Sequence, residues 1–244
     1  MKKLLSLVMT GVLAASALTA CGSSGSTTGT QAAAGAETTS AETAAAGAAS
    51  TGNSGEEVVF GTGGTTGTYY AVGGVMATVL NPLMQNSHLT VTSTGASKAN
   101  IQLIDDGDAD LAIVQNDVMS YAHEGTDLFA DEGAYETFAP VAGLYDETVQ
   151  IITCTDDIKT VADLKGKTVS VGDAGSGVEF NARQILDAYG ISFDDIKVVN
   201  ASFGDSADSL KDEKIDAAFI VAGAPTTAVV DLSTTKAVHL VELD

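Results

Sequence analysis

The stretch Val58–Leu80, VVFGTGGTTGTYYAVGGVMATVL, decides the fold of this chain. The short apolar run Val58–Phe60 predicts a β-strand, and the apolar run Tyr69–Leu80 predicts a helix. Four glycines lie in the seven-residue turn GTGGTTG between them. Such a turn lets the backbone approach a bound group closely and points free N–H groups and the positive end of the helix dipole at it. The stretch therefore predicts a strand–turn–helix unit with a site for a small anionic ligand.

The first 20 residues have the pattern of a secretory signal. Lys2 and Lys3 precede an apolar run that ends in Leu18-Thr19-Ala20-Cys21. That ending resembles a lipobox, where bacteria attach lipid to the cysteine and cleave before it. We expect Cys21 to be lipidated and to anchor an extracytoplasmic protein to the outer side of a bacterial membrane. The alternative is an ordinary small-residue cleavage site that happens to precede a cysteine.

Residues 21–57 have the composition of a flexible tether. The segment is mostly Ala, Gly, Ser, Thr and Glu, with no aromatic residue and no aliphatic one larger than Ala. Such a segment cannot bury enough apolar area to offset the entropy of ordering. The folded part is therefore predicted to begin near Val58, with one lobe over residues 58–145 and a second over 146–244.

The mature chain is strongly acidic. Lys2 and Lys3 leave with the signal, so nine basic residues remain against 32 acidic ones, a formal charge of −23. Nucleic acid and anionic surfaces are poor partners for such a field, and solubility is its simplest meaning. Cys154 lies in an apolar run and is predicted to be a small core residue without a disulfide partner.

Strand and helix patterns alternate through the folded part. This predicts an α/β fold with largely parallel sheets, in which ligands lie at the carboxyl ends of the strands. Ser97 and Gly190 are the expected helix cap residues. The turns after Phe60, Ser93, Gln115, Val171 and Ala222 are expected to face a cleft between the lobes. The predicted strands are 58–60, 89–93, 110–115, 137–144, 149–154, 168–171, 196–200, 215–222 and 238–243, and the predicted helices are 68–83, 97–106, 117–123, 177–189, 206–214 and 225–232.

The sequence lacks the usual signatures of an enzyme. GTGGTTG has no following Gly-Lys-Ser/Thr, and Thr66 replaces the third glycine of a dinucleotide fingerprint. Ala174 stands where a nucleophile elbow around Ser176 needs glycine, and no histidine is paired with a carboxylate pattern. We expect a protein without catalysis, metal or cofactor. Arg183 is the sole arginine and lies two turns into its helix, so amides, hydroxyls and helix dipoles must bind the ligand.

Five segments resemble one family in order and spacing: GTGGTTGTYYAVGG, STGASKANIQLIDDGDADLAIVQND, APVAGLYDETVQII, DLKGKTVSVGDAGSGVEFNARQIL and KIDAAFIVAGAPTTAV. The chain resembles the TAXI family of solute-binding proteins of TRAP transporters. The resemblance implies a type II periplasmic-binding-protein fold with two α/β lobes around a cleft and a hinge near Tyr145–Val149. It also implies a monomer that captures a small organic acid, glutamate, 2-oxoglutarate or a similar dicarboxylate, for a TRAP permease driven by an ion gradient.

The same resemblance implies a set of ligand-binding residues from four turns and the join between the lobes. Glu147 lies at that join too, beside Tyr145. Ala96 and Asp146 stand where relatives often have Gly and Pro. The implied ligand-binding residues are Thr66, Gly67, Tyr69, Thr94, Ser97, Gln115, Asn116, Tyr145, Gly175, Ser176 and Gly177.

Relatives continue beyond the position of Asp244, so the resemblance implies that the return segment to the first lobe is missing.

Three alternative functions remain open at this point. The protein could serve an ATP-driven (ABC) importer of the same fold, or sense a ligand for a membrane receptor kinase. A hydrolase is disfavoured by the missing nucleophile–base pair.

Overall fold

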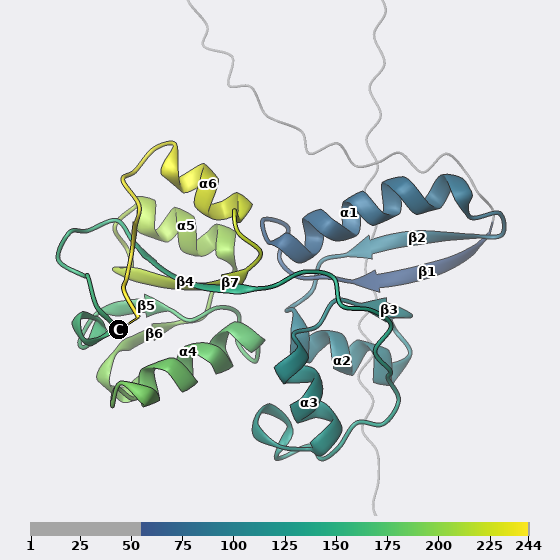
Figure 1. Ribbon diagram of the computed structural model, residues 1–244, viewed down its shortest axis with the longest axis horizontal. Helices are drawn as coiled ribbons and strands as arrows, with labels where there is room; N and C mark the ends of the chain where they lie inside the picture. The colour runs from purple at the N-terminus through teal and green to yellow at the C-terminus, as the bar shows by residue number, and fades with distance from the viewer. Residues whose placement is uncertain (1–54, 244) are drawn as a thin grey trace, which may run out of the picture. The chain divides into compact units, whose positions relative to one another are not determined.

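The computed structural model describes residues 55–243 (Figure 1). The predicted signal, Cys21 and most of the predicted linker lie outside the described residues. Two β-sheets with their helices belong to one compact unit of the chain. We call the parts before and after the predicted boundary at 145/146 lobe 1 and lobe 2; this boundary stays a prediction. The predicted α/β alternation is confirmed.

Lobe 1 is built on a parallel three-stranded sheet in the order β2-β1-β3. Strand β1 pairs with β2 from Glu56 opposite Ser87 to Gly61 opposite Thr92. Phe60 and Leu89 pack with Tyr69 of α1 in one core cluster, and α2, α3 and η2 form a second one around Phe129. The elements are β1 (Glu56–Gly61), α1 (Thr68–Leu80), η1 (Asn81–Leu83), β2 (Ser87–Thr92), α2 (Ser97–Asp106), β3 (Leu111–Ala112), α3 (Asn116–Glu124) and η2 (Asp127–Phe129).

Lobe 2 is built on a five-stranded sheet in the order β6-β5-β7-β4-β8. Strand β7 is parallel to β5 and antiparallel to β4, so this sheet is mixed. Every residue of β7 is buried: Phe219 packs on the α4 side and Ile220 on the side of α5 and α6. This explains its unbroken apolar sequence. The elements are β4 (Thr148–Thr153), η3 (Val161–Leu164), β5 (Thr168–Ser170), α4 (Gly177–Ala188), η4 (Phe193–Asp195), β6 (Lys197–Val199), α5 (Phe203–Lys211), β7 (Ala217–Ala222), α6 (Thr227–Ser233) and β8 (His239–Leu240).

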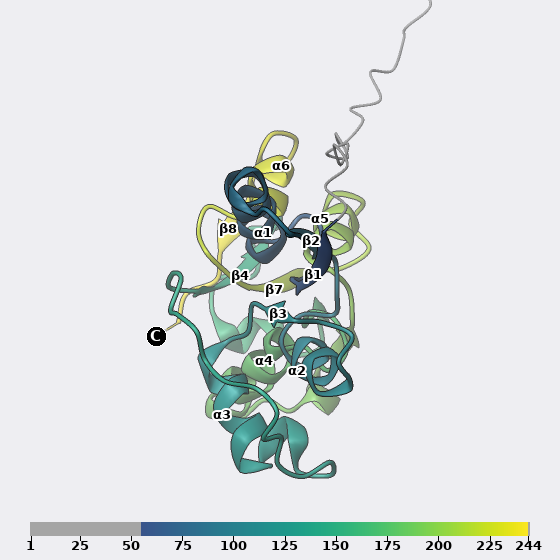
Figure 2. The ribbon, with the colours of Figure 1, turned by 90° about the vertical axis from the view of Figure 1, so that its right-hand side faces the viewer.

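The helices cover both faces of the sheets. Helices α1, α5 and α6 lie on one side, and α2, α3 and α4 lie on the other (Figures 1 and 2). Helices α1, α4 and α5 are each joined by a short turn to the carboxyl end of the preceding strand, β1, β5 and β6 respectively. This arrangement brings several helix N-termini to the region between the two sheets.

Two local predictions are wrong. Residues 137–144 form no strand: Val141 is 85% exposed, and Pro140 lacks the N–H that a strand ladder needs. This exposed segment instead connects the two lobes (Figure 1). Ser97 is not the N-cap of α2; Ala96 holds that position with φ 67°. The Ser97 side chain is buried instead, and its Oγ accepts a hydrogen bond from the Gln115 N–H at 3.1 Å.

Asn100 fixes the strand ends of lobe 1. Its side chain is fully buried, and Nδ2 donates to the carbonyl oxygens of Thr62 at 2.7 Å and Ile113 at 2.8 Å. Its Oδ1 accepts from the Thr94 hydroxyl at 2.7 Å. One amide therefore joins the turns that follow β1, β2 and β3, which holds the walls of the site in a fixed relation.

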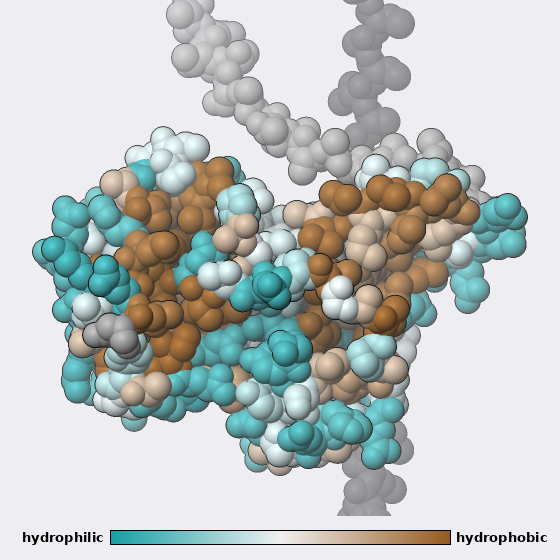
Figure 3. Space-filling model, in the orientation of Figure 1, coloured by the Kyte–Doolittle hydropathy of each residue, from teal (hydrophilic) through white to brown (hydrophobic). Residues whose placement is uncertain are grey.

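Helix α1 keeps an exposed apolar face. Val75 and Val79 of α1 and Leu83 of the following η1 are more than half exposed, and hydrophobic surface covers this helix in Figure 3. Across the described range, 55–243, no helix combines the length and apolarity that a membrane crossing requires. Cys154 is a free cysteine. It was predicted to be a core residue, and it lies partly buried against the lobe 2 core.

Candidate functional site

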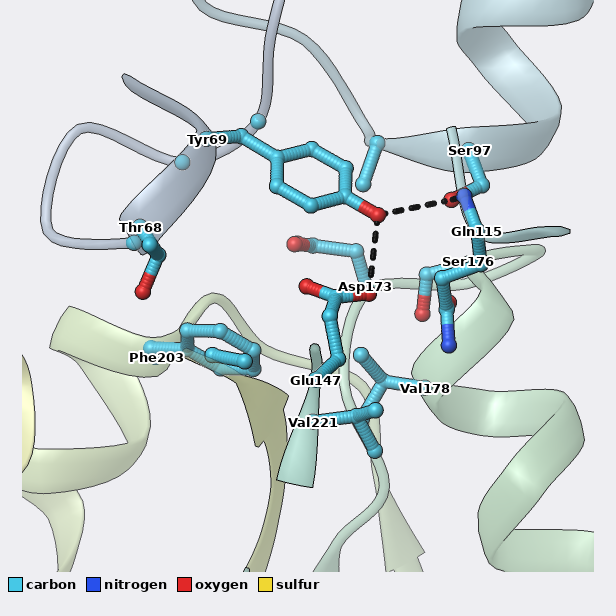
Figure 4. A pocket seen from close by; sticks show the side chains of 15 residues that line it. Thr68, Tyr69, Ser97, Gln115, Glu147, Asp173, Ser176, Val178, Phe203 and Val221 are labelled. Carbon is cyan, nitrogen blue, oxygen red and sulfur yellow. Dashed lines mark hydrogen bonds between the residues drawn. The ribbon is translucent and has the colours of Figure 1, made fainter. Parts of the chain in front are cut away.

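A cavity of about 40 Å³ lies between turns from both lobes, as expected from the strand ends. It adjoins a cleft of about 1000 Å³, and Tyr69, Gln115, Glu147 and Val221 line both spaces. Figure 4 shows the side chains around the cavity. The residues lining it are Gly63, Gly64, Gly67, Thr68, Tyr69, Ala96, Ser97, Gln115, Glu147, Asp173, Ser176, Val178, Phe203, Val221 and Ala222.

The N-terminus of α1 forms one wall of the cavity. Gly67 is its N-cap, and no side chain caps this end of the helix. The first N–H groups of α1 therefore have no intrahelical partner. The Gly67 N–H closes the turn by donating to the Gly64 carbonyl at 2.9 Å. A Cβ on Gly67 would lie 3.2 Å from that carbonyl and 3.5 Å from the Phe203 ring, so glycine suits this close approach.

The N-terminus of α4 forms the opposite wall. Ser176 is its N-cap, and Oγ accepts from the Glu179 N–H at 3.2 Å. Gly175 has φ +74°, a conformation that glycine adopts without strain. A Cβ on Gly177 would overlap the Gln115 side chain, so this glycine lets lobe 1 and lobe 2 meet. The N–H groups of Gly177 and Val178 have no intrahelical partner because they begin the helix.

Glu147 places a carboxylate in the cavity. It directly precedes β4, and its Oε2 accepts a hydrogen bond from the Tyr69 hydroxyl at 3.0 Å (Figure 4). Its Oε1 is buried and has no hydrogen-bond partner within residues 55–243. Burial, and to a smaller extent the charge of Asp117, raises the pKa of Glu147 to about 7. Burial and the Glu147 charge also raise the pKa of Tyr69, which stays protonated.

The site is acidic and holds no cationic side chain. Asp173 lines the cavity with Glu147, and its pKa is raised by burial and by the charge of Asp205. Within the described part of the chain, no Lys, Arg or His lines the cavity or the adjoining cleft. The Arg183 guanidinium carbon lies 3.9 Å from the centroid of the Phe193 ring, and Arg183 lines neither the cavity nor the cleft.

Polar contacts join the two lobes beside the cavity. The Gln115 Nε2 donates to Asn181 Oδ1 at 2.7 Å, and the Asn181 Nδ2 donates to Asp117 Oδ2 at 2.9 Å. The Thr68 hydroxyl donates to the Gly223 carbonyl at 3.1 Å. These bonds hold the lobes together in this structure. Residues 55–243 contain no group of His, Cys, Asp and Glu placed to bind a metal ion.

The structure brings most of the predicted site residues together. Asn116 and Tyr145 line the larger cleft. Gly175 and Gly177 flank the cavity at the start of α4 without lining it. The predicted residues that line the cavity itself are Gly67, Tyr69, Ser97, Gln115 and Ser176.

Two predicted residues lie elsewhere. Thr66 lines a separate groove beside α5 and α6. The Thr94 hydroxyl oxygen lies 2.7 Å from Asn100 Oδ1 and 2.9 Å from the Thr62 carbonyl oxygen, either of which can accept its one proton, and it accepts from the Ala96 N–H at 3.1 Å. Its polar contacts are therefore made within the scaffold of lobe 1.

Two residues that line the cavity, Asp173 and Phe203, were not predicted from the sequence. Glu147 was noted at the join between the lobes but was not among the implied ligand-binding residues. Asp173 stands in the GDAGSG turn, so its position beside Ser176 was a usable signal. Phe203 and Val221 carry no such signal, because an apolar residue near a strand end is as compatible with the core.

Residues 60–244 match the NMT1-like family. The chain belongs to the NMT1-like family. Solved structures with a similar fold include the alkanesulfonate-binding protein SsuA from Xanthomonas axonopodis pv. citri, at 18% identity and TM-score 0.53 over 76% of this chain. The binding protein component of an ABC phosphonate transporter from Pseudomonas aeruginosa is 15% identical, with a TM-score of 0.53 over 77% of the chain and 65% of that protein.

An ancestral arginine-binding protein bound to arginine is 16% identical, with a TM-score of 0.51 over 76% of the chain and 78% of that protein. The chain spans only 60% of the Xanthomonas protein. These likenesses confirm the predicted fold class, the type II periplasmic-binding-protein fold. At such low identity they concern the fold of this NMT1-like family member and not its ligand.

Proposed function

We propose that this NMT1-like family member is an extracytoplasmic solute-binding protein that captures a small polar solute between its lobes. The cavity carries this proposal, because its walls come from turns of both lobes and include the uncapped N-terminus of α1. Helix N-termini are suited to binding carboxylates and other anions. Binding and release require no catalysis, and the proposed transport role needs none.

The proposed cycle is closure of the lobes around the solute. The segment of residues 139–147 has no helix or strand and would serve as the hinge, together with the start of β4. The bonds of Gln115 and Thr68 across the lobes would form as the cleft closes. A membrane partner would thus distinguish the solute-bound protein from the empty one by the distance between its lobes.

Native mass spectrometry of the full chain, purified without added ligand, tests this proposal. We expect one small molecule to co-purify with the protein and to be lost when the protein is dialysed. The proposal is wrong if no solute co-purifies and no member of a broad panel of organic acids, amino acids and sulfonates changes the melting temperature.

The proposed partner is a membrane transporter. The resemblance to TAXI proteins favours a TRAP permease and a dicarboxylate ligand such as glutamate or 2-oxoglutarate. The P. aeruginosa protein with the same fold serves an ABC phosphonate transporter, so an ABC importer is the second candidate. Cross-linking in membranes, followed by mass spectrometry, should capture a permease without an ATPase subunit in the first case and with one in the second.

Membrane attachment through Cys21 is proposed from the lipobox-like sequence. The full chain should fractionate with membranes, and a Cys21→Ser variant should be found in the soluble extracytoplasmic fraction. An unchanged distribution of the variant would contradict lipidation at Cys21. A receptor kinase captured in the cross-linking experiment would instead favour a sensory role.

A further inference from the structure

One carboxylate oxygen of Glu147 is a buried acceptor that no hydrogen-bond donor of residues 55–243 contacts. The Tyr69 hydroxyl satisfies Oε2 at 3.0 Å, whereas Oε1 is buried without a partner in the described part of the chain. A buried carboxylate oxygen without a donor is unfavourable, so such an atom in a cavity marks a position where a ligand can supply one.

The charges around Glu147 favour a cationic donor. Asp173 lines the same cavity, and Asp117 and Asp146 line the adjoining cleft. The Lys98 side chain lies beside Gly175 at the start of α4 and is already bound to Glu132 and to the Leu128 carbonyl. Among residues 55–243, no cationic side chain lines the cavity or the adjoining cleft.

The opposite walls carry partial positive charge. The first N–H groups of α1 and α4 have no intrahelical partner, and the dipoles of both helices are positive at these ends. The cavity is thus lined by the first residues of two helices as well as by two carboxyl groups. This pattern complements a solute with an anionic and a cationic group close together.

We propose that the solute carries a protonated amine beside its carboxylate, as an α-amino acid does, and that Glu147 binds this amine. The inference rests on the proposed solute-binding function and deepens it. The ammonium would donate to Oε1 of Glu147, while the Tyr69 hydroxyl holds Oε2 in place (Figure 4). The solute carboxylate would lie at the N–H groups of α1 and α4, and its side chain would extend into the larger cleft.

Glu147 is consequently a specificity-determining residue. A 2-oxo acid has the carbon skeleton of its amino acid but presents a carbonyl oxygen where the amine would be. That oxygen would face an acceptor, leaving Oε1 unsatisfied and adding electrostatic repulsion. The geometry therefore favours glutamate over 2-oxoglutarate among the ligands implied by the sequence.

Calorimetry on matched pairs tests the inference with the full chain. The probes are L-glutamate with 2-oxoglutarate and glutarate, L-alanine with pyruvate, and L-arginine with 5-guanidino-2-oxopentanoate. We expect at least one amino acid to bind, and its 2-oxo partner to bind at least about tenfold more weakly. Glu147→Gln should weaken the binding of the amino acid by a similar factor and leave the affinity for the 2-oxo acid unchanged. Glu136→Gln, at an exposed position, is the matched control.

The pH dependence gives an independent readout. Glu147 must be ionised to bind an ammonium, so amino-acid affinity should rise with pH and level off above about 7. The other titratable groups around it are Tyr69, Tyr145, Asp117, Asp146 and Asp173; both tyrosines have raised pKa values and stay protonated. A dicarboxylate without an amine should show the opposite slope, since it favours protonated Glu147.

The outcomes separate this inference from the proposed function. If 2-oxo acids or glutarate bind and the amino acids do not, the inference fails while the solute-binding function stands. The inference also fails if Na⁺ or K⁺ alone raises the melting temperature of the protein and prevents amino acids from binding. It fails too if Glu147→Gln leaves amino-acid affinity unchanged. If nothing binds in the panel and nothing co-purifies, both fail.

Discussion

Replacing Glu147 by Gln should remove a loss of stability that the ligand-free protein undergoes as the pH becomes alkaline. The folded protein raises the pKa of this carboxyl from 4.5 to about 7, mainly by burial. The stability contributed by protonated Glu147 is fully present below about pH 4.5 and is lost as the pH rises through about 7. Each pKa unit corresponds to about 1.4 kcal/mol, so the full loss is about 3 kcal/mol.

Glutamine keeps the size of the side chain and an oxygen that can accept from Tyr69, but it does not titrate. The free energy of unfolding of Glu147→Gln minus that of the wild type should therefore increase by about 2.5 kcal/mol between pH 5 and pH 8.5. Any cost of the new amide group is independent of pH and cancels in this comparison. The change with pH thus reports on Glu147 alone.

Urea unfolding followed by circular dichroism at several pH values measures this difference. Circular dichroism is suitable because the chain has no tryptophan. Glu136→Gln is the control, since Glu136 is exposed, and its difference from the wild type should be flat with pH. A flat difference for Glu147→Gln as well would refute the reasoning, because it would mean that folding does not hold this carboxyl in its protonated form.

Three further changes test the scaffold around the cavity. Asn100→Ala removes three buried hydrogen bonds and should lower the free energy of unfolding by about 3 kcal/mol in urea; a loss below about 1 kcal/mol would contradict the role given to this amide. Gly177→Ala places a methyl group against Gln115 and should open the lobes, which small-angle scattering would detect as a larger radius of gyration than the wild type. Ser176→Ala removes the cap of α4 and should destabilise the protein by about 1 kcal/mol while weakening solute binding; unchanged affinity in calorimetry would remove Ser176 from the site.

Most elements could be predicted because their patterns are local. Helix α4 was expected to end before Gly190, and it does, with Gly190 at φ +69°. The buried strand β7 was visible as an apolar run. Residues 137–144 were misjudged because apolar residues there suggested burial, whereas only the tertiary structure shows that no strand lies beside them.

Part of the candidate site could be predicted for a topological reason. The carboxyl ends of parallel strands meet at one edge of a sheet, so residues such as Tyr69 and Ser176 were expected near a ligand. The bonds of Thr94 within lobe 1 could not be predicted, because a hydroxyl in a turn can serve the scaffold as readily as a ligand. Its partner Asn100 is local in sequence, but the two carbonyls to which Asn100 donates belong to two other turns, those after β1 and β3.

The sequence by itself determined the alternation of strands and helices, the glycine-rich turn at residues 61–67 and the absence of an enzyme signature. Only the tertiary structure placed the Glu147 carboxylate against the Tyr69 hydroxyl, 78 positions away in the chain. It also put Asp173 into the same cavity and left one oxygen of Glu147 without a hydrogen-bond partner among residues 55–243. The physical reason is that propensity and periodicity act over a few residues, whereas burial and charge depend on every group that folding brings near.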